Sequence, residues 1–301
     1  MRLRRILAPL AFLVCGLLVV SGCGVSGADD SDEILSPYAM EQADRANLPE
    51  EIKEILARGK IVIGTKFDQP LLGKRNVATG RIEGFDAEIG RIIAQRIFGK
   101  VAEGSNIEFV ETTSSRRVDY INNDTADLVI STFSMSEERK KEVDFAGPYF
   151  VAGQTYMTRG DSDIKTLKDL AGEKVCVVKG ANSLDNLEEE GIKTKESEPL
   201  RDYSSCAAAL AAGQYEAVST DDIILYGFQD SAVHDFRVDK NTFTEEQYGV
   251  GMKHGSPKLR EFINDTLEEA FLNGDWDKAF ERTMGAAGVP RPAHQPILDR
   301  Y

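Results

Sequence analysis

The chain has 301 residues and carries 36 Lys and Arg side chains against 50 Asp and Glu, which gives a net charge of −14 at pH 7. Such an acidic surface repels nucleic acid and anionic headgroups, so a nucleic-acid-binding role is excluded. The roughly 250 residues that follow the N-terminal region are enough for one large domain or for two lobes.

Residues 1–22 are predicted to be a lipoprotein signal peptide. Three arginines stand within the first five residues, and the apolar run Ile6–Val20 is too short to span a bilayer comfortably. The tetrapeptide VSGC, residues 20–23, is similar to the lipobox of bacterial lipoproteins, in which the peptidase cuts before the cysteine and the thiol carries a lipid. The alternative is an ordinary secretory signal with an incidental Cys23. We therefore expect Cys23 to anchor the mature chain to the outer face of the cell membrane, through a flexible tether over residues 23–49.

Two cysteines, Cys176 and Cys206, remain once the signal peptide and the lipidated cysteine are set aside. In an oxidising compartment an even pair predicts a disulfide, with two buried free thiols as the alternative. The three histidines are scattered, and the spacing of Cys and His does not fit zinc. We therefore predict one disulfide, no metal site and no cofactor.

From residue 48 to residue 144, predicted helices alternate with predicted strands. Helices are predicted at residues 48–60, 85–99, 114–124 and 136–144. Strands are predicted at residues 60–65, 106–111 and 126–132, and residues 66–84 are expected to form a turn-rich loop. This alternation predicts parallel sheets with helices on both faces.

A second set of elements begins near Val151. Strands are predicted at residues 155–159, 173–180, 215–220, 234–239 and 247–253. Helices are predicted at residues 166–172, 183–191, 203–213, 221–231, 256–274 and 275–285. The last long helix, 256–274, carries an apolar stripe that indicates burial in a core. The repeated pattern suggests two similar lobes, although the sequence contains no literal repeat.

The segment ADLVISTFSMSEERKKEVDFAGPYF, residues 126–150, carries the most specific motif of the chain. A strand is followed by a Ser/Thr-rich turn, an arginine, and a Phe-Ala-Gly-Pro-Tyr sequence. This order resembles the amino-acid-binding proteins of ABC importers, solute-binding protein family 3, although Ala146 stands where that family usually has serine. Further segments match in order: GTKFDQP (64–70), GRIEGFDAEIGRIIA (80–94), LKDLAGEKVCVVKGANS (167–183) and LAAGQYEAVSTDD (210–222). The resemblance covers nearly all of residues 50–286, and within the family it is strongest to the glutamate-binding lipoproteins of actinobacteria.

The resemblance implies an α/β fold of the two-lobed periplasmic-binding-protein type II, with the ligand in the cleft between the lobes. Lobe 1 would take residues 50–150 and the return from 247 to 301, which includes the C-terminal tail. Lobe 2 would take residues 151–246. Two crossings, near Phe150–Gln154 and near Phe243–Tyr248, would form the hinge.

A free amino acid carries a carboxylate and an ammonium on one carbon, so its recognition needs both a cation and an anion. By the resemblance, Arg139 with Ser134 and Thr132 would hold the α-carboxylate, and Asp221 would hold the α-ammonium. The alternatives are that the serine- and threonine-rich turn is only a helix cap, that Arg139 is a solvated charge, and that Asp222 takes the place of Asp221.

Further polar contacts would complete the pocket. Asn182 and Ser183, in the loop after the strand 173–180, would contact the carboxylate of the ligand. A glutamate ligand needs a second cationic partner for its side chain, and Lys66 and Arg117 are the candidates. Local cations in a cleft of low dielectric can attract an anion even though the whole chain is acidic.

The resemblance implies that the chain captures a free amino acid, with glutamate favoured, and delivers it to the membrane permease subunits of an ABC importer. We expect a monomer that is not an enzyme. The sequence lacks a GxxxxGK[ST] phosphate loop, so ATP hydrolysis by this chain is not expected. The alternatives are a sensor lipoprotein that reports amino acids to a membrane kinase and an enzyme of the same fold, such as a dehydratase that acts on cyclic acids.

Overall fold

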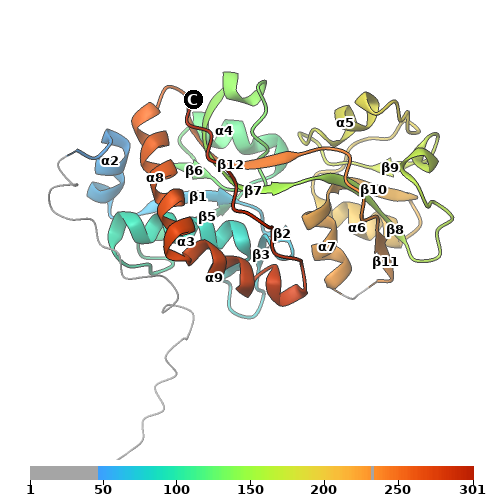
Figure 1. The fold of residues 1–301 in the computed structure, drawn as a ribbon, viewed down its shortest axis with the longest axis horizontal. Coiled ribbons are helices and arrows are strands. Elements are labelled where there is room, and N and C mark those ends of the chain that lie inside the picture. Colours follow the sequence, from blue (N-terminus) through green and yellow to red (C-terminus); the bar gives the residue numbers. More distant parts are fainter. Residues whose placement is uncertain (1–46, 232–233) are drawn as a thin grey trace, which may run out of the picture. The chain divides into compact units, whose positions relative to one another are not determined.

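The computed structural model describes residues 47–231 and 234–301, all of which lie within one compact unit, Glu33–Tyr301. Two mixed sheets and one small antiparallel sheet form its framework (Figure 1). None of the helices in these two ranges is long and apolar enough to cross a bilayer. The predicted signal peptide, Cys23 and the tether up to residue 46 lie outside the described residues.

The first sheet has five strands in the order β5-β1-β6-β12-β7. Their bounds are Ile107–Glu111 (β5), Ile61–Thr65 (β1), Leu128–Val129 (β6), Glu246–Lys253 (β12) and Val143–Ala152 (β7). β1 runs parallel to β5 and β6, whereas β12 runs antiparallel to β6 and β7. The prediction of a parallel sheet is therefore wrong here, because β12 returns from the second half of the chain and enters between β6 and β7.

Helices flank this sheet because each has an apolar stripe to bury. They are α2 (Glu50–Arg58), α3 (Phe85–Phe98), α4 (Arg117–Asn122), α8 (Pro257–Asn273) and α9 (Asp275–Arg282). α2 ends where expected, at Gly59, whose φ of 76° favours glycine. Figure 1 shows α3, α8 and α9 side by side, and the rings of Phe85 and Trp276 pack edge to face there with centroids 5.5 Å apart. This aromatic contact joins the early and late parts of the chain.

The second sheet has four strands in the order β11-β8-β10-β9. Their bounds are Phe236–Val238 (β11), Gln154–Arg159 (β8), Ala217–Asp221 (β10) and Val175–Cys176 (β9). β9 is parallel to β10, and β8 is antiparallel to both β10 and β11. Three helices accompany this sheet: α5 (Ser183–Glu189), α6 (Tyr203–Ala211) and α7 (Asp222–Asp230). This sheet is mixed as well, because β8 enters it as the direct continuation of β7.

Strands β7 and β12 connect the two sheets. They pair antiparallel from Val143 opposite Lys253 to Ala152 opposite Glu246. After Gly153, the chain continues as β8, which belongs to the second sheet. The chain therefore leaves the first sheet at Gly153 and re-enters it at β12, which is the connectivity of a fold with two crossings.

Three local predictions are wrong. The loop at residues 66–84 contains a small antiparallel sheet of β2 (Asp68–Gln69), β3 (Gly73–Arg75) and β4 (Ile82–Glu83). The helix predicted at 136–144 is a 3-10 turn, Arg139–Lys141, because pairing with β12 draws Val143 and Asp144 into β7. The helix predicted at 114–124 is shorter, since residues 114–116 form a 3-10 turn before α4.

The predicted disulfide is confirmed. Cys176 on β9 and Cys206 on α6 are bonded, with their Cα atoms 5.7 Å apart, and both residues are fully buried. The bond joins a strand and a helix of the second sheet's layer. It therefore braces that half of the molecule internally.

Candidate ligand-binding site

Two arginines in the layer of the first sheet contact a loop in the layer of the second sheet. Arg117 begins α4, and Arg139 begins the 3-10 turn before β7. Each donates a hydrogen bond from Nη2 to the carbonyl oxygen of Gly180, at 3.2 Å in both cases. The Phe133 ring lies against both guanidinium groups, with its centroid 4.3 Å from Arg117 Cζ and 5.2 Å from Arg139 Cζ. The two cations are thus held together and directed at one carbonyl group.

The guanidinium of Arg117 is fixed by main-chain acceptors. It donates to the carbonyl oxygens of Ser114 (3.1 Å), Ser131 (3.2 Å) and Thr132 (2.8 Å). Burial lowers the pKa of Arg117 to about 9, and the positive charge of Arg139 contributes to this shift. The group stays charged at neutral pH, and an anion beside it would be strongly favoured.

Lys66 is a third buried cation, only 2% exposed. Its Nζ donates to the hydroxyl of Ser114 at 2.7 Å and lies 5.9 Å from the centroid of the Tyr203 ring. Burial, together with the positive charge of Arg117, lowers the pKa of Lys66 to about 7. Because the hydrogen-bond partner of Lys66 is neutral, a carboxylate beside Lys66 would stabilise its charged form.

Asp221 supplies negative charge from the second sheet, at the end of β10. Its Oδ2 accepts a hydrogen bond from the Tyr248 hydroxyl at 2.5 Å. Burial, together with the nearby charge of Glu246, raises the pKa of Asp221 to about 7. By contrast, Asp222 accepts from the backbone N–H groups of Ile223 (2.7 Å) and Gly153 (3.4 Å). Of the two aspartates, Asp221 is the one that interacts electrostatically with both arginines.

The Ser/Thr-rich turn is shaped by contacts other than a simple helix cap. The N–H of Thr132 donates to Asp86 Oδ2 at 2.9 Å, and the φ of Thr132 is +44°, a strained value for a β-branched residue. The carbonyl of Ser134 accepts from Arg139 Nη1 at 2.9 Å. The cap itself is made by Ser136, whose Oγ accepts from the N–H of Arg139 at 3.3 Å. Thr132 and Ser134 are therefore free of the capping role.

The two residues predicted in the loop before α5 contact partners from the strands that cross between the sheets. Asn182 donates from Nδ2 to both carboxylate oxygens of Glu246, at 3.0 and 3.2 Å. The carbonyl of Ser183 accepts from Gln154 Nε2 at 2.9 Å, and the side chain of Ser183 is buried. Arg139 interacts electrostatically with Glu246 and Asp221, which links this group of hydrogen bonds to the two arginines.

Sequence reasoning missed two buried carboxylates of this network, Asp86 and Glu246. Asp86 is fully buried, and its Oδ1 accepts from the Tyr149 hydroxyl at 2.8 Å. Glu246 accepts from Asn186 as well as from Asn182. The sequence does contain a signal for Glu246. Every second residue after Glu246 in β12 is apolar, and alternate residues of a strand share a face, so Glu246 lies on the buried face of β12. Asp86 lies in the first turn of α3, where acidic residues are common, so the sequence gave no such signal for it.

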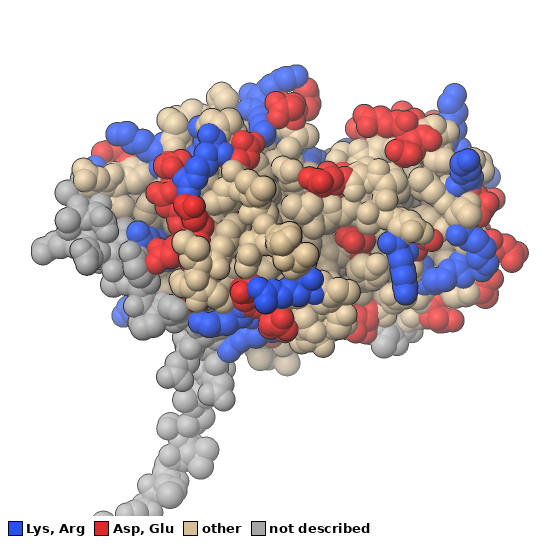
Figure 2. Space-filling model, viewed as in Figure 1, with Lys and Arg blue, Asp and Glu red and all other residues tan. Residues whose placement is uncertain are grey.

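The arrangement suits a zwitterion. Three cations stand on one side, and Asp221 and Glu246 stand on the other. Figure 2 shows acidic and basic side chains interspersed over one face of the molecule, so attraction of an anionic ligand depends on the buried cations. Within residues 47–231 and 234–301, no group of three or more His, Cys, Asp or Glu could hold a metal ion.

Comparisons with known proteins bear on the family and the fold. Residues 61–286 match the model of the bacterial extracellular solute-binding proteins, family 3. The ABC transporter glutamine-binding protein GlnH of Bacillus subtilis is 31% identical over 281 residues, which are 93% of this chain and 97% of that relative. The glutamate-binding protein GluB of Corynebacterium glutamicum is 32% identical over 244 residues, 78% of this chain and 81% of the relative. A crystal structure of a mutant of ArgBP from T. maritima superposes with a TM-score of 0.69 at 30% identity, covering 78% of this chain and 99% of that one.

Proposed function

The chain belongs to family 3 of the bacterial extracellular solute-binding proteins, and we propose that its ligand is L-glutamate. It is a binding protein for amino acids with the type II periplasmic-binding-protein fold, and not an enzyme, as its homologues indicate. Two relatives named for glutamine are 31% and 36% identical and one named for glutamate is 32% identical, so the proposal of glutamate depends on the site itself.

The observation that carries the choice of glutamate is the third buried cation, Lys66. One carboxylate and one ammonium are common to all amino acids, and Arg139 and Asp221 suffice for them. Lys66 and Arg117 add two positive charges to a buried site that holds one nearby acid, Asp86, so a neutral glutamine side chain would leave part of this charge without a partner. A second carboxylate on the ligand would neutralise it.

The proposed contacts follow from the network described above. Arg139, with Thr132 and Ser134, holds the α-carboxylate, which replaces the neutral Gly180 carbonyl as partner of the guanidinium groups. Asp221 holds the α-ammonium, and Asn182 and Ser183 add polar contacts. Lys66 and Arg117 hold the side-chain carboxylate. The hydrogen bonds of Arg117 to Ser131 and Thr132 support this by fixing the guanidinium before the ligand arrives.

We assign the lobes by the two large sheets. Lobe 1 takes residues 50–150 and 247–301, and lobe 2 takes residues 151–246. The hinge lies where β7 continues into β8 and where the chain returns to β12. The pairing of β7 with β12 supports this assignment, because a two-stranded ribbon can twist while each sheet stays intact.

The surroundings of the protein are proposed on the same basis. Cys23, outside the described residues, carries the lipid that anchors the chain to the outer face of the cell membrane. The partner is the permease of an ABC importer, which receives the ligand from a monomer of this protein. The glutamine-binding relative in Bacillus subtilis, named as part of an ABC transporter, supports this assignment.

Calorimetric titration against the twenty amino acids tests the ligand. The full chain is first unfolded and refolded without reductant to remove any carried ligand. We expect L-glutamate to bind at least about tenfold more tightly than L-glutamine, since a hydrogen bond to a charged group contributes about 1.5–3 kcal/mol. Lys66→Gln is expected to abolish this preference, and Lys60→Gln, at the half-exposed ion pair with Glu108, is expected to leave it unchanged.

Two results would contradict the proposal at different levels. Tighter binding of glutamine, unaffected by Lys66→Gln, would overturn glutamate as the ligand and leave the family intact. The absence of binding to any of the twenty amino acids would overturn amino-acid capture itself.

A further inference from the structure

A small contact beside the ligand-binding network joins the two lobes at β2, where Asp68 also interacts electrostatically with Lys66. The first part of it is Asp68, whose Oδ2 accepts a hydrogen bond from the N–H of Ser204 at 3.1 Å. Ser204 lies in the first turn of α6, where Asp202 caps the next N–H, that of Ser205, at 2.9 Å. The amino end of α6 thus receives one carboxylate from its own lobe and one from lobe 1. Free N–H groups and the helix dipole favour both carboxylates.

The second part of the contact is the approach of Pro70 to Gly227. Gly227 is in the middle of α7, where glycine weakens a helix relative to alanine. A Cβ at this position would lie 2.4 Å from the carbonyl oxygen of Pro70. Leu71, the residue after Pro70, has a φ of 68°, so the turn that positions the Pro70 carbonyl is itself strained. Glycine at 227 therefore allows a backbone of lobe 1 to touch a helix of lobe 2.

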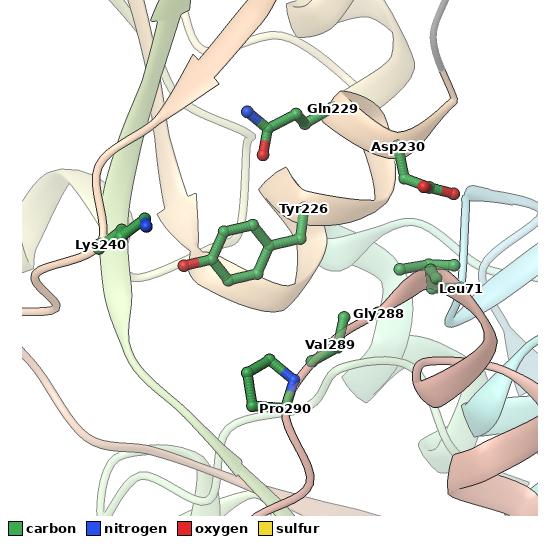
Figure 3. A pocket seen from close by; sticks show the side chains of 9 residues that line it. Leu71, Tyr226, Gln229, Asp230, Lys240, Gly288, Val289 and Pro290 are labelled. Atoms are coloured by element: carbon green, nitrogen blue, oxygen red, sulfur yellow. The ribbon is translucent and has the colours of Figure 1, made fainter.

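The contact is narrow. Beside it lies a cavity of about 610 Å³, lined by Tyr226 and Asp230 of α7 on one side and by Leu71 and Val289 on the other (Figure 3). The lobes touch at Pro70 and Gly227 but stand apart next to this point. Asp68 is half-buried, and the hydrogen bond to Ser204 lies at the surface. Such a contact can separate when the hinge opens, without disturbing either core.

We propose that Asp68, Pro70, Ser204 and Gly227 form a latch that holds the lobes together and sets ligand affinity without touching the ligand. The inference rests on the proposed function, in which ligand binds between closed lobes. The apparent dissociation constant is the intrinsic constant divided by the fraction of protein in the competent state. A contact made only when the lobes are together raises that fraction, so its loss weakens binding chiefly by faster release of the ligand.

Two substitutions test the latch by calorimetry, stopped-flow kinetics and thermal melting of the full chain with L-glutamate and L-glutamine. Gly227→Ala is expected to weaken binding by about tenfold or more while the melting temperature stays equal or rises, because alanine favours the helix but blocks the approach of Pro70. Asp68→Ala is expected to weaken binding by about three- to tenfold. The control, Thr166→Ala, removes the capping box of the 3-10 turn Leu167–Leu170 in the same lobe and is expected to lower the melting temperature slightly with less than a twofold change in affinity.

Unchanged dissociation constants in both Gly227→Ala and Asp68→Ala would overturn the latch while leaving the proposed function standing. If the wild-type chain binds no amino acid, the proposed function fails, and the latch is then judged on the unliganded protein by small-angle X-ray scattering. The latch predicts a larger radius of gyration for Gly227→Ala than for the wild type. Equal radii would overturn it.

Discussion

At the scale of single residues, the site consists of buried charges that lack their best partners. Lys66 and Arg117 are cations with lowered pKa values, and Asp221 is an acid with a raised pKa. Burial is the main cause in each case, because it disfavours the charged form. Folding keeps these charges buried at a cost, and a zwitterionic ligand offsets part of that cost on binding.

Arg139→Ala is expected to weaken the binding of every amino acid by about 100-fold, since a two-pronged hydrogen bond to a carboxylate is lost. Calorimetric titration measures the change. The control is Arg116→Ala, because Arg116 is exposed and its guanidinium lies over the Tyr120 ring, 5.3 Å from the centroid. Equal affinities for the Arg139 variant and the wild type would remove Arg139 from the site.

The affinity for glutamate is expected to be greatest near pH 7. Below this, protons occupy Asp221, whose pKa is about 7 before the ligand ammonium arrives, so affinity falls by up to about tenfold per pH unit. Above it, Lys66 loses its proton and no longer attracts the side-chain carboxylate, so affinity falls again. Titrations between pH 5 and pH 9 measure both limbs.

Two variants separate the limbs of this profile. Asp221→Asn is expected to bind weakly and to lack the acid limb, and Lys66→Gln is expected to lack the alkaline limb. The buried acid Asp86, whose pKa is also raised to about 7, faces Tyr149 and Thr132 and is retained in both variants. If the glutamate affinity of Asp221→Asn still falls below pH 7 as it does in the wild type, protonation of Asp86 would account for that fall.

At the scale of elements, β7 links the two sheets, whereas the disulfide links two elements of one sheet's layer. β7 runs for ten residues and pairs with β12 at both ends, with an irregularity at residues 147–149, so it carries the chain from one sheet to the other. The disulfide joins β9 to α6 within the second sheet's layer. The strand pair thus links the halves, and the covalent bond stiffens only one of them.

Replacing both cysteines, in Cys176→Ser with Cys206→Ser, is expected to lower the free energy of unfolding by about 3–4 kcal/mol, because the unfolded chain regains the freedom of a loop that spans a sequence separation of 30 residues. Denaturant unfolding followed by circular dichroism measures this. Binding of glutamate at 25 °C is expected to persist, since the sulfur atoms are buried away from the charged network. A double variant as stable as the wild type would show that the bond adds nothing to stability.

At the scale of the whole molecule, we propose that the N-terminal segment determines where the protein works. We expect Cys23→Ala to release the protein from the membrane fraction into the medium, because several acyl chains on one residue are needed for firm anchoring. Cell fractionation with antibody detection measures the distribution. The purified variant is expected to bind glutamate as the wild type does, and full retention in the membrane would exclude Cys23 as the anchor.

The sequence by itself determined the features that depend on neighbouring residues. The glycines after α2, α3 and α8 end these helices in left-handed conformations, as expected of helix C-termini. The motif around Arg139 was sufficient to indicate the family, and the order of motifs indicated the fold. These signals are local, because caps, turns and periodicity are read within a few residues.

Only the tertiary structure decided features that depend on distant partners. β7 contains Gly147 and Pro148, which argue against a strand, yet β12, about 100 residues later, pairs with β7 on both sides of them, and Asn264 accepts from the N–H of Gly147. Glu246 joins the site because the fold brings β12 beside α5, and Asp86 joins it because α3 begins next to Thr132. The contact of Pro70 with Gly227 likewise joins segments some 150 residues apart. Burial and pairing of this kind are properties of the assembled chain, and no local pattern encodes them.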